Sequence, residues 1–331
     1  MAKFKVVITD YIFDNLDTER SILKECDSEL IALQCKSVEE LIPFTMDADA
    51  ILNTYLGGLD EHFFSTLKKC KVVVRYGIGI DTIDVSAATQ HGVMVANVPD
   101  YCIEEVSDHA VACVLALVRK LTFSDRCVRQ GNWDLGYLKP IHRLKGLVVG
   151  IVGMGRIGRR SSHKISSFGV SLIFHDPYVE TDIVSDGFHA RRVTLEELVA
   201  ESDIILIHAP ATPETYHLFN KELFSQMKRK PVIINCARGT LVDTDALIEA
   251  LAEGQVSGAA LDVIEGVPPF PPDNPLCQFD NVIITPHSAW YSEEAIVNLQ
   301  RLAVEEVARV LKGEQPKSLV NPEVLSDTRH N

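Results

Sequence analysis

A glycine-rich segment near the middle of the chain, Gly153-Met154-Gly155-Arg156-Ile157-Gly158, directly follows an apolar run over 147–152. A GxGxxG pattern alone is weak evidence, but here the run before it predicts a buried parallel strand and residues 159–168 predict a helix. A second apolar run, 172–174, leads to Asp176, 18 residues past Gly158 (176 − 158). This order of strand, turn, helix, strand and acid is typical of a dinucleotide-binding unit.

The residue types in this segment suit a pyrophosphate. Gly153 permits a tight bend, Gly155 lets the backbone approach the phosphates, and Gly158 lets the helix pack on the strand, while the helix N-terminus offers free N–H groups. Asp176 would accept hydrogen bonds from ribose hydroxyls and repel a 2′-phosphate, and no arginine follows it in Pro177-Tyr178. The pattern therefore favours NAD over NADP. The competing interpretation is a structural turn that binds nothing.

Strand-like and helix-like segments alternate along the rest of the chain. This alternation predicts an α/β protein with two Rossmann-like or flavodoxin-like domains, each built on a parallel sheet. The expected strands are 4–9, 29–33, 50–53 and 72–75 before the glycine segment, and 204–208, 232–235, 259–261 and 282–285 after it. The expected helices are 16–24, 38–42, 61–68, 104–130, 195–201, 221–227, 246–253 and 293–312.

The long terminal helix is expected to pack back on the first domain. We therefore predict a substrate-binding domain from 1–100 plus 290–331, with an NAD-binding domain, 101–289, inserted into it. Ligands in such folds bind at the carboxyl ends of strands, and here also in the cleft between the domains. The Pro-rich stretch 268–272 is expected to be a rigid surface connection beside that cleft.

Bulk composition excludes several classes of protein. The chain has 331 residues, 46% of them hydrophobic, which suits about two well-buried globular domains. A net charge of −14 argues against a nucleic-acid partner. No run of 18 apolar residues and no leader-like N-terminus is evident, so we expect no membrane association. The eight cysteines form no C-x-x-C pair, which predicts reduced thiols, no metal site and a cytoplasmic location.

Three polar residues stand at the predicted ends of neighbouring strands. Arg238 follows the strand at 232–237, Asp262 follows 259–261, and His287 follows 282–286. Hydride transfer between a nicotinamide and a carbonyl needs a proton donor, a cation for a substrate carboxylate, and a dry pocket. Taken alone, each residue has an ordinary structural explanation as an ion-pair partner or a cap. Together, beside a nucleotide motif, they predict a catalytic site.

The segment Asn235-Cys236-Ala237-Arg238-Gly239-Thr240-Leu241-Val242-Asp243 resembles the arginine motif of the D-isomer-specific 2-hydroxyacid dehydrogenases. Thr285-Pro286-His287 resembles their histidine motif, and Asn97-Val98-Pro99 the exit from their first domain. Three further segments are similar to the branch that includes the C-terminal-binding protein corepressors and their bacterial dehydrogenase relatives: 74–81, 99–105 and 287–293. The resemblance covers nearly the whole chain.

This resemblance implies roles for named residues. Arg238 would bind the carboxylate and carbonyl oxygen of a 2-oxo acid, and His287 would exchange a proton with that oxygen. Further substrate contacts would come from backbone amides and side chains at Tyr55, Gly57, Ile78, Gly79, Arg75 and Trp290. The coenzyme contacts would come from Gly153, Gly155, Arg156, Ile157, Gly158, Asp176, His208, Ala209, Pro210, Thr215, Cys236, Ala237 and Asp262.

One position departs from the family pattern. The family's catalytic glutamate, five residues after the aspartate that is Asp262 here, is replaced by Val267. That glutamate orients the catalytic imidazole and raises its pKa, so without it the pKa of His287 is expected to fall toward or below about 6.5. Glu265 could substitute for it, as could Glu293 or Glu294 from the terminal helix. Otherwise the enzyme tolerates the loss.

The leading functional hypothesis is an NAD-dependent oxidoreductase that interconverts a D-2-hydroxy acid and a 2-oxo acid. The alternative is an NAD(H)-sensing, corepressor-like scaffold with degraded catalysis, which Val267 favours. A third keeps the fold and coenzyme but uses a substrate that supplies its own acid or base. The resemblance also implies a homodimer formed through the coenzyme domains, with 104–130 in the contact.

Overall fold

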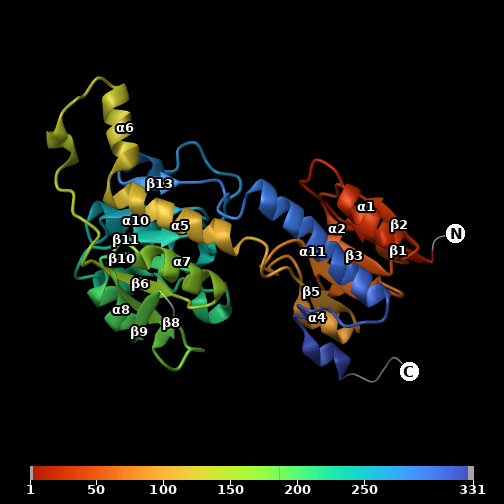
Figure 1. The fold of residues 1–331 in the computed structure, drawn as a ribbon. Helices are drawn as coiled ribbons and strands as arrows, with labels where there is room; N and C mark the ends of the chain where they lie inside the picture. The colour runs from red at the N-terminus through yellow and green to blue at the C-terminus, as the bar shows by residue number, and fades with distance from the viewer. Residues whose placement is uncertain (1–2, 186, 327–331) are drawn as a thin grey trace. The chain divides into compact units, whose positions relative to one another are not determined.

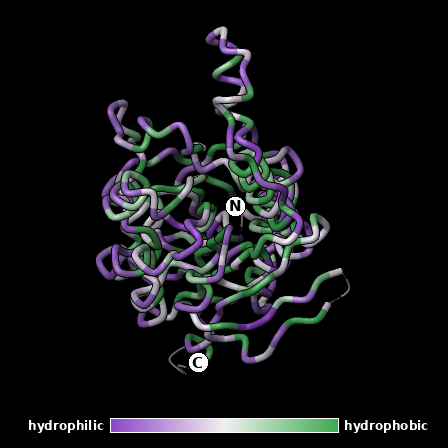
Figure 2. The backbone as a smooth tube through the Cα atoms, turned by 90° about the vertical axis from the view of Figure 1, so that its left-hand side faces the viewer, coloured by the Kyte–Doolittle hydropathy of each residue, from purple (hydrophilic) through white to green (hydrophobic). Residues whose placement is uncertain are grey.

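The computed structural model describes residues 3–185 and 187–326, and the chain divides into two compact units. The first comprises Met1–Cys102 and Ser292–Asn331, and the second comprises Ile103–Tyr291. Apolar segments run through the interior strands while the outer loops are mainly hydrophilic (Figure 2). In the described part of the chain, no helix combines the length and apolar character needed to cross a membrane.

The first unit is built on a five-stranded sheet in the order β2-β1-β3-β4-β5 (Figure 1). All four pairings are parallel. The strands are β1 (Phe4–Ile8), β2 (Ser28–Ala32), β3 (Ala50–Asn53), β4 (Val72–Arg75) and β5 (Met94–Ala96), and the helices are α1 (Asp17–Lys24), α2 (Val38–Thr45), α3 (Glu61–Ser65), α4 (Val85–Gln90) and α11 (Glu293–Leu311). The order reverses between β1 and β3, which is where ligands bind in doubly wound sheets.

The terminal helix α11 belongs to this first unit. It contacts α1, β3 and β4. A buried polar network lies at this contact: the Glu19 carboxylate of α1 accepts from the Tyr76 hydroxyl at 2.9 Å and from Gln300 Nε2 of α11 at 3.1 Å. Burial raises the pKa of the Glu19 carboxyl. Although α11 lies near the C-terminal end of the chain, it thus belongs to the unit that contains the N-terminal strands.

The second unit contains an eight-stranded sheet in the order β13-β12-β11-β10-β6-β7-β9-β8. Only the edge pairing of β8 with β9 is antiparallel among these strands. The strands are β6 (Val148–Val152), β7 (Ser171–His175), β8 (Ile183–Ser185), β9 (Phe188–Arg192), β10 (Ile204–Ile207), β11 (Val232–Asn235), β12 (Gly258–Leu261) and β13 (Val282–Ile284). The order reverses between β6 and β10, beside the glycine segment.

Two apolar clusters bury the faces of this sheet. One cluster joins strand residues such as Ile205 and Ile233 to residues of α8 (Leu195–Glu201), α9 (Lys221–Ser225) and α10 (Thr244–Ala252). The other joins the opposite strand residues to α5 (Ile103–Val118) and α7 (Arg156–Ser166). A strand covered on both faces reads as a continuous apolar run, which explains why these strands could be predicted from sequence.

The structure differs from the sequence prediction at three places. The stretch 104–130, expected to be one helix, is two: α5 ends at Val118 and α6 (Leu121–Arg129) begins after Lys120, whose φ of 53° breaks the helical path. Helix α7 starts at Arg156 rather than 159, directly inside the glycine segment. The short elements β5, α4, β8 and β9 were not expected, because three-to-six-residue segments carry little periodicity.

Candidate active site

The glycine segment forms a cradle beside the N-terminus of α7. Gly153 has φ +92°, and a Cβ placed there would lie 2.5 Å from the Ala209 backbone nitrogen. A Cβ on Gly158 would lie 2.2 Å from the Gly153 carbonyl oxygen, which shows how closely the helix meets the turn. A Cβ on Gly155, by contrast, would have no neighbour within 4 Å. The cradle is therefore open only beside Gly155, where a pyrophosphate needs close backbone approach.

Asp176 closes the adjacent strand end in a fixed orientation. Its Oδ2 accepts a hydrogen bond from the Met154 amide at 2.7 Å, and its Oδ1 accepts from the Tyr178 amide at 2.9 Å. Each carboxylate oxygen has a second lone pair with which to accept from a ribose hydroxyl. The exposed Gly155 is the N-cap of α7, and the exposed Arg156 and half-buried Ile157 are its first two residues. The residues present fit a dinucleotide with a free 2′-hydroxyl.

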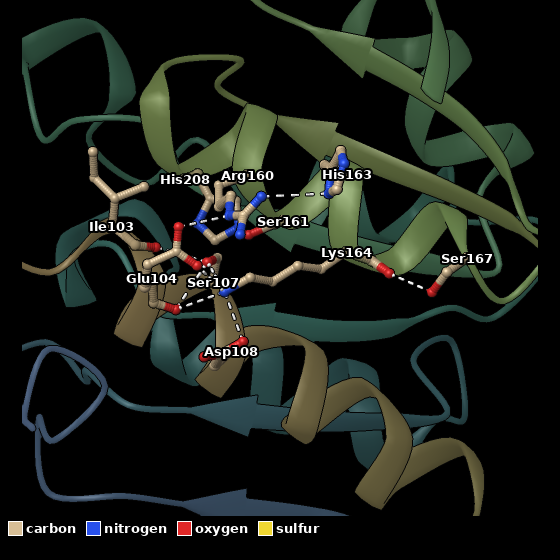
Figure 3. Close-up of polar contacts among 10 residues, drawn as sticks. All are labelled: Ile103, Glu104, Ser107, Asp108, Arg160, Ser161, His163, Lys164, Ser167 and His208. Atoms are coloured by element: carbon tan, nitrogen blue, oxygen red, sulfur yellow. Dashed lines mark hydrogen bonds and ion pairs between the residues drawn. The ribbon is translucent and has the colours of Figure 1, made fainter. Parts of the chain in front are cut away.

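The loop after β10 contains His208, Ala209 and Pro210, and its backbone packs against Gly153. Figure 3 shows the His208 ring directed at α7, with Nε2 lying 3.0 Å from the Ser161 hydroxyl. Burial lowers the pKa of His208 to about 4, so the ring is neutral at physiological pH. The placement of His208 at the nicotinamide end stays a prediction, and its ring nitrogen is engaged with Ser161. The Thr215 hydroxyl, likewise, donates to the Pro210 carbonyl at 2.7 Å and shapes this loop.

The same view shows how α7 is attached to the first turn of α5 (Figure 3). The Lys164 ammonium lies 2.9 Å from a carboxylate oxygen of Glu104 and 2.6 Å from one of Asp108, and it donates to the Ser107 hydroxyl at 2.8 Å. Arg160 pairs with the other Glu104 oxygen at 2.7 Å, and these two cations lower the pKa of the Glu104 carboxyl. Helix α7 is thus held against α5 through Arg160 near its middle and Lys164 near its C-terminal end.

Arg238 leaves β11 on a loop whose backbone is tightly constrained. The buried Asn235 side chain donates to the Arg238 carbonyl at 2.9 Å and accepts from the Ala237 amide at 3.0 Å. The half-buried Arg238 side chain donates to the Ala237 carbonyl at 2.8 Å. A Cβ on Gly239 would lie 2.3 Å from the Ile264 carbonyl carbon, so this loop packs against the loop after β12.

Asp262 organises the turn that carries His287. The residue is buried, with 3% of its surface exposed. Its carboxylate accepts hydrogen bonds from the Thr285 hydroxyl at 2.5 Å and from the Ser288 and Ala289 amides at 2.9 and 3.0 Å. The Asp262 carbonyl accepts from the His287 amide at 2.9 Å. We expected Asp262 to line the nicotinamide end. That contact stays a prediction. Both carboxylate oxygens of Asp262 hold the histidine turn, in which the exposed His287 has φ 52°.

Two further side chains are influenced by or lie near this carboxylate. His109 of α5 carries no predicted role, and it lies 3.2 Å from the Thr285 hydroxyl and 3.8 Å from Asp262 Oδ1. No local pattern marks it, because its partners are far along the chain. Burial, with Cys113 and Asp262 nearby, raises the pKa of the Cys236 thiol, which is therefore neutral at physiological pH.

Glu265, one candidate to replace the missing glutamate, is engaged elsewhere. Its Oε2 lies 2.7 Å from His217 Nε2. Glu293 and Glu294 begin α11, which belongs to the first unit. Trp290 follows the histidine turn and meets Tyr291 edge-on, with ring centroids 5.8 Å apart. Within the described residues, no three His, Cys, Asp or Glu side chains gather as a metal ion would require.

The predicted substrate loops of the first unit follow β3 and β4. The Tyr55 amide donates to Asp10 Oδ2 at 2.7 Å, so this amide is already used. The Ile78 carbonyl accepts from the Asn97 side chain at 2.7 Å, which holds the loop that continues to Gly79. The Arg75 guanidinium lies 5.7 Å from the centre of the Tyr55 ring, and a Cβ on Gly77 would collide with it. Arg75 therefore lies folded over its own loop.

Comparisons with known proteins show the family to which the chain belongs. The family model for the D-isomer specific 2-hydroxyacid dehydrogenase, NAD binding domain, matches residues 111–289. A glyoxylate reductase from Thermofilum pendens is 38% identical over 98% of this chain and 96% of its own length. The D-3-phosphoglycerate dehydrogenase of Methanocaldococcus jannaschii is 35% identical over 96% of this chain, which spans 59% of that longer protein.

Solved structures show the same likeness. The D-lactate dehydrogenase of Aquifex aeolicus, determined with NAD and lactic acid, superimposes with a TM-score of 0.84 at 29% identity, covering 93% of this chain and 96% of that one. The chain belongs to the D-isomer specific 2-hydroxyacid dehydrogenase family and contains its NAD-binding domain. It is an NAD-dependent oxidoreductase that acts on CH–OH donors.

Proposed function

We propose that this enzyme interconverts a small D-2-hydroxy acid and its 2-oxo acid with NAD(H). The observation that carries the proposal is the arrangement around Asp262, which fastens the His287 turn to the sheet edge where the Arg238 loop also ends. Strands β11, β12 and β13 are parallel neighbours, so the residues that follow them share one edge with the glycine cradle.

The chain's own groups match the needs of the reaction. NAD supplies the hydride acceptor, and NADH the hydride, when bound. Arg238 binds the substrate carboxylate and carbonyl oxygen through its planar fork of N–H donors. His287 donates a proton to the carbonyl oxygen during reduction and takes it back during oxidation. The neutral Cys236 provides an uncharged wall beside them.

The first unit contributes the remaining substrate contacts in this proposal. Backbone amides at Leu56–Gly58 and at Ile78–Gly79 bind the substrate carboxylate, with the Tyr55 amide removed from this set by Asp10. Arg75 and Trp290 contact the substrate beyond its carboxylate. The glyoxylate reductase relative suggests glyoxylate and similarly short 2-oxo acids as the first compounds to test.

Val267 supports a second candidate, a scaffold that binds NAD(H) with degraded catalysis. Position 267 lacks a carboxylate, and Glu265 is bound by His217. The two candidates differ in turnover. Purified enzyme with NADH and a panel of 2-oxo acids, followed by absorbance between pH 5 and 8, should show turnover that Arg238→Ala removes without weakening NADH binding. Tight NADH binding with no turnover of any 2-oxo acid would favour the scaffold.

We further propose a homodimer in the cytosol, associated through the coenzyme units. Helix α6 and the segment after it stand away from their sheet (Figure 1). This segment carries exposed large apolar side chains: Leu121 (55%), Trp133 (88%), Leu135 (66%) and Tyr137 (54%). Large exposed apolar and aromatic side chains gathered in one segment of the chain are characteristic of protein interfaces. The eight free cysteines suit a reducing compartment.

A further inference from the structure

A second cluster of polar side chains lies between three loops that leave the eight-stranded sheet. The loops follow β10, β11 and β12. His217 of the first loop lies 2.7 Å through Nε2 from Glu265 Oε2 of the third, and 3.9 Å through Nδ1 from Asp243 Oδ2 at the end of the second. The His217 and Glu265 side chains are each less than one-third exposed. One imidazole thus faces acids from both neighbouring loops.

Backbone contacts join the same three loops. The His217 amide donates to the Thr240 carbonyl at 2.8 Å, and the Phe219 amide donates to the Leu241 carbonyl at 2.9 Å. Gly239 packs on Ile264–Glu265 so closely that a side chain there would collide with the backbone. The Arg238 loop is therefore held between the other two, by His217 on one side and by the Glu265 segment on the other.

Two features indicate that contacts with neighbouring residues, and not the intrinsic backbone preference of histidine, fix the conformation of His217. Its φ is 47°, a left-handed conformation that histidine rarely adopts. Its ring stacks on the Tyr216 ring, with centroids 4.0 Å apart and planes 14° apart. The Glu265 carboxylate also accepts a hydrogen bond from the Tyr216 hydroxyl, which raises the pKa of that tyrosine. These contacts hold the imidazole beside Glu265 although the positive φ of His217 is energetically unfavourable.

We propose that His217 and Glu265 act as a pair of positioning residues for Arg238, setting the orientation in which its guanidinium meets the 2-oxo acid. This inference rests on the proposed function, since it assigns Arg238 to the substrate. Neither member of the pair touches the reacting atoms. The pair acts by joining the loops before and after the arginine loop, so that the guanidinium needs no reorganisation on binding.

The test uses variants that spare the backbone. His217→Asn is the principal one, because asparagine tolerates a positive φ while its amide is too short to replace the imidazole. Glu265→Ala removes the other partner, and Glu265→Gln keeps an acceptor oxygen. His91→Gln is the matched control, because His91 forms a similar pair with Glu61 at 2.8 Å on the first unit.

We expect the variants to lower kcat/KM for the 2-oxo acid while leaving NADH affinity nearly unchanged. His217→Asn and Glu265→Ala should each lower kcat/KM for the 2-oxo acid by about tenfold or more, mainly through KM. NADH affinity should stay within about twofold, and Glu265→Gln should retain most of the activity. The double variant His217→Asn/Glu265→Ala should lose no more than either single one, because both changes break the same pair.

Other results would overturn the pairing. Kinetics of His217→Asn that match those of His91→Gln, additive losses in the double variant, or an equal loss of NADH affinity would each contradict it. Oxamate binding to the enzyme–NADH complex, followed by fluorescence, separates this test from the proposed function because it needs no turnover. If the wild-type enzyme binds oxamate but turns over no 2-oxo acid, the catalytic proposal is refuted. The oxamate affinities of the variants then still test the His217–Glu265 pair. Failure to bind oxamate at all refutes both.

Discussion

At the scale of single residues, Asp262 and His208 show how a strand-end position acquires its role. Both follow parallel strands at the edge where ligands bind, and both were predicted to contact the coenzyme. Within the protein, the Asp262 side chain holds the histidine turn and the His208 side chain meets Ser161 of α7, while their contacts with the coenzyme stay predictions. Position along a strand indicates which edge a residue occupies. The direction of its side chain depends on neighbours far away in sequence.

The replacement of the family's glutamate by Val267 gives a residue-scale prediction about pH. Val267→Glu should place a carboxylate near the imidazole of His287, which favours the protonated ring and raises its pKa. The protonated ring is the proton donor in reduction. The pH at which the reduction rate falls off should therefore move up by a similar amount. Initial rates of NADH oxidation from pH 5 to 9 measure this, and an unchanged profile contradicts the assignment.

Asp176 gives a second prediction, on coenzyme choice. Asp176→Ser should remove the repulsion between the carboxylate and a 2′-phosphate and remove an acceptor for the ribose hydroxyls. The ratio of kcat/KM with NADH to that with NADPH should fall by about tenfold, a change of about 1.4 kcal/mol. Val184→Ser, on the exposed edge strand β8, is the control. If the ratio is unchanged, another group sets the preference.

At the scale of an element, the start of α7 has two glycines with different surroundings. Gly158→Ala places a Cβ 2.2 Å from the Gly153 carbonyl oxygen, so the helix must shift, at a cost of about 1–3 kcal/mol of unfolding free energy. Gly155→Ala meets nothing within 4 Å and costs at most about 1 kcal/mol as a changed N-cap. It fills the phosphate side of the cradle instead.

The two variants should therefore separate stability from binding. Thermal unfolding should show the larger fall in Tm for Gly158→Ala, while titration with NADH should show at least about tenfold weaker binding for Gly155→Ala despite its near-native Tm. Native NADH affinity in Gly155→Ala would mean that the pyrophosphate does not approach this glycine.

At the scale of the whole molecule, one buried carboxyl joins segments from both ends of the chain. Burial is the largest influence on Glu19 and raises its pKa above 4.5 in the folded state. An acid with a raised folded pKa contributes stability that is full below the unfolded pKa and is lost as pH rises through the folded pKa. Glu19→Gln does not titrate. The Tm of wild type relative to this variant should fall as pH is raised from 4.5 to 8, and a constant difference contradicts the prediction.

The exposed apolar segment after α5 gives a prediction about assembly. Trp133→Ser should weaken the proposed homodimer and increase the proportion of monomer in sedimentation at micromolar concentration, because a large exposed aromatic side chain is a frequent anchor of interfaces. Val184→Ser, which also removes a highly exposed apolar side chain, should leave the dimer intact. A wild-type protein that sediments as a monomer would refute the homodimer.

Local sequence was enough to predict the central parallel strands, the glycine segment and the residues that follow the strands. Strands such as β6 and β10 are buried on both faces, so their apolar runs are visible without a partner, and the cradle lies within 24 consecutive residues (153–176). The break at Lys120 was missed because its left-handed backbone interrupts no apolar pattern. His109, the partner of Asp262 and Thr285, carried no local signal.

Tertiary structure alone decided which groups each polar side chain meets. Glu265 was an open candidate for the missing carboxylate until its 2.7 Å contact with His217 appeared, and these residues are 48 positions apart. Hydrogen bonds between side chains depend on angstrom-scale distances that loops of variable length create. Local sequence carries periodicity and turn chemistry, whereas the contacts that orient Arg238 and His287 arise only when the strand ends share one edge.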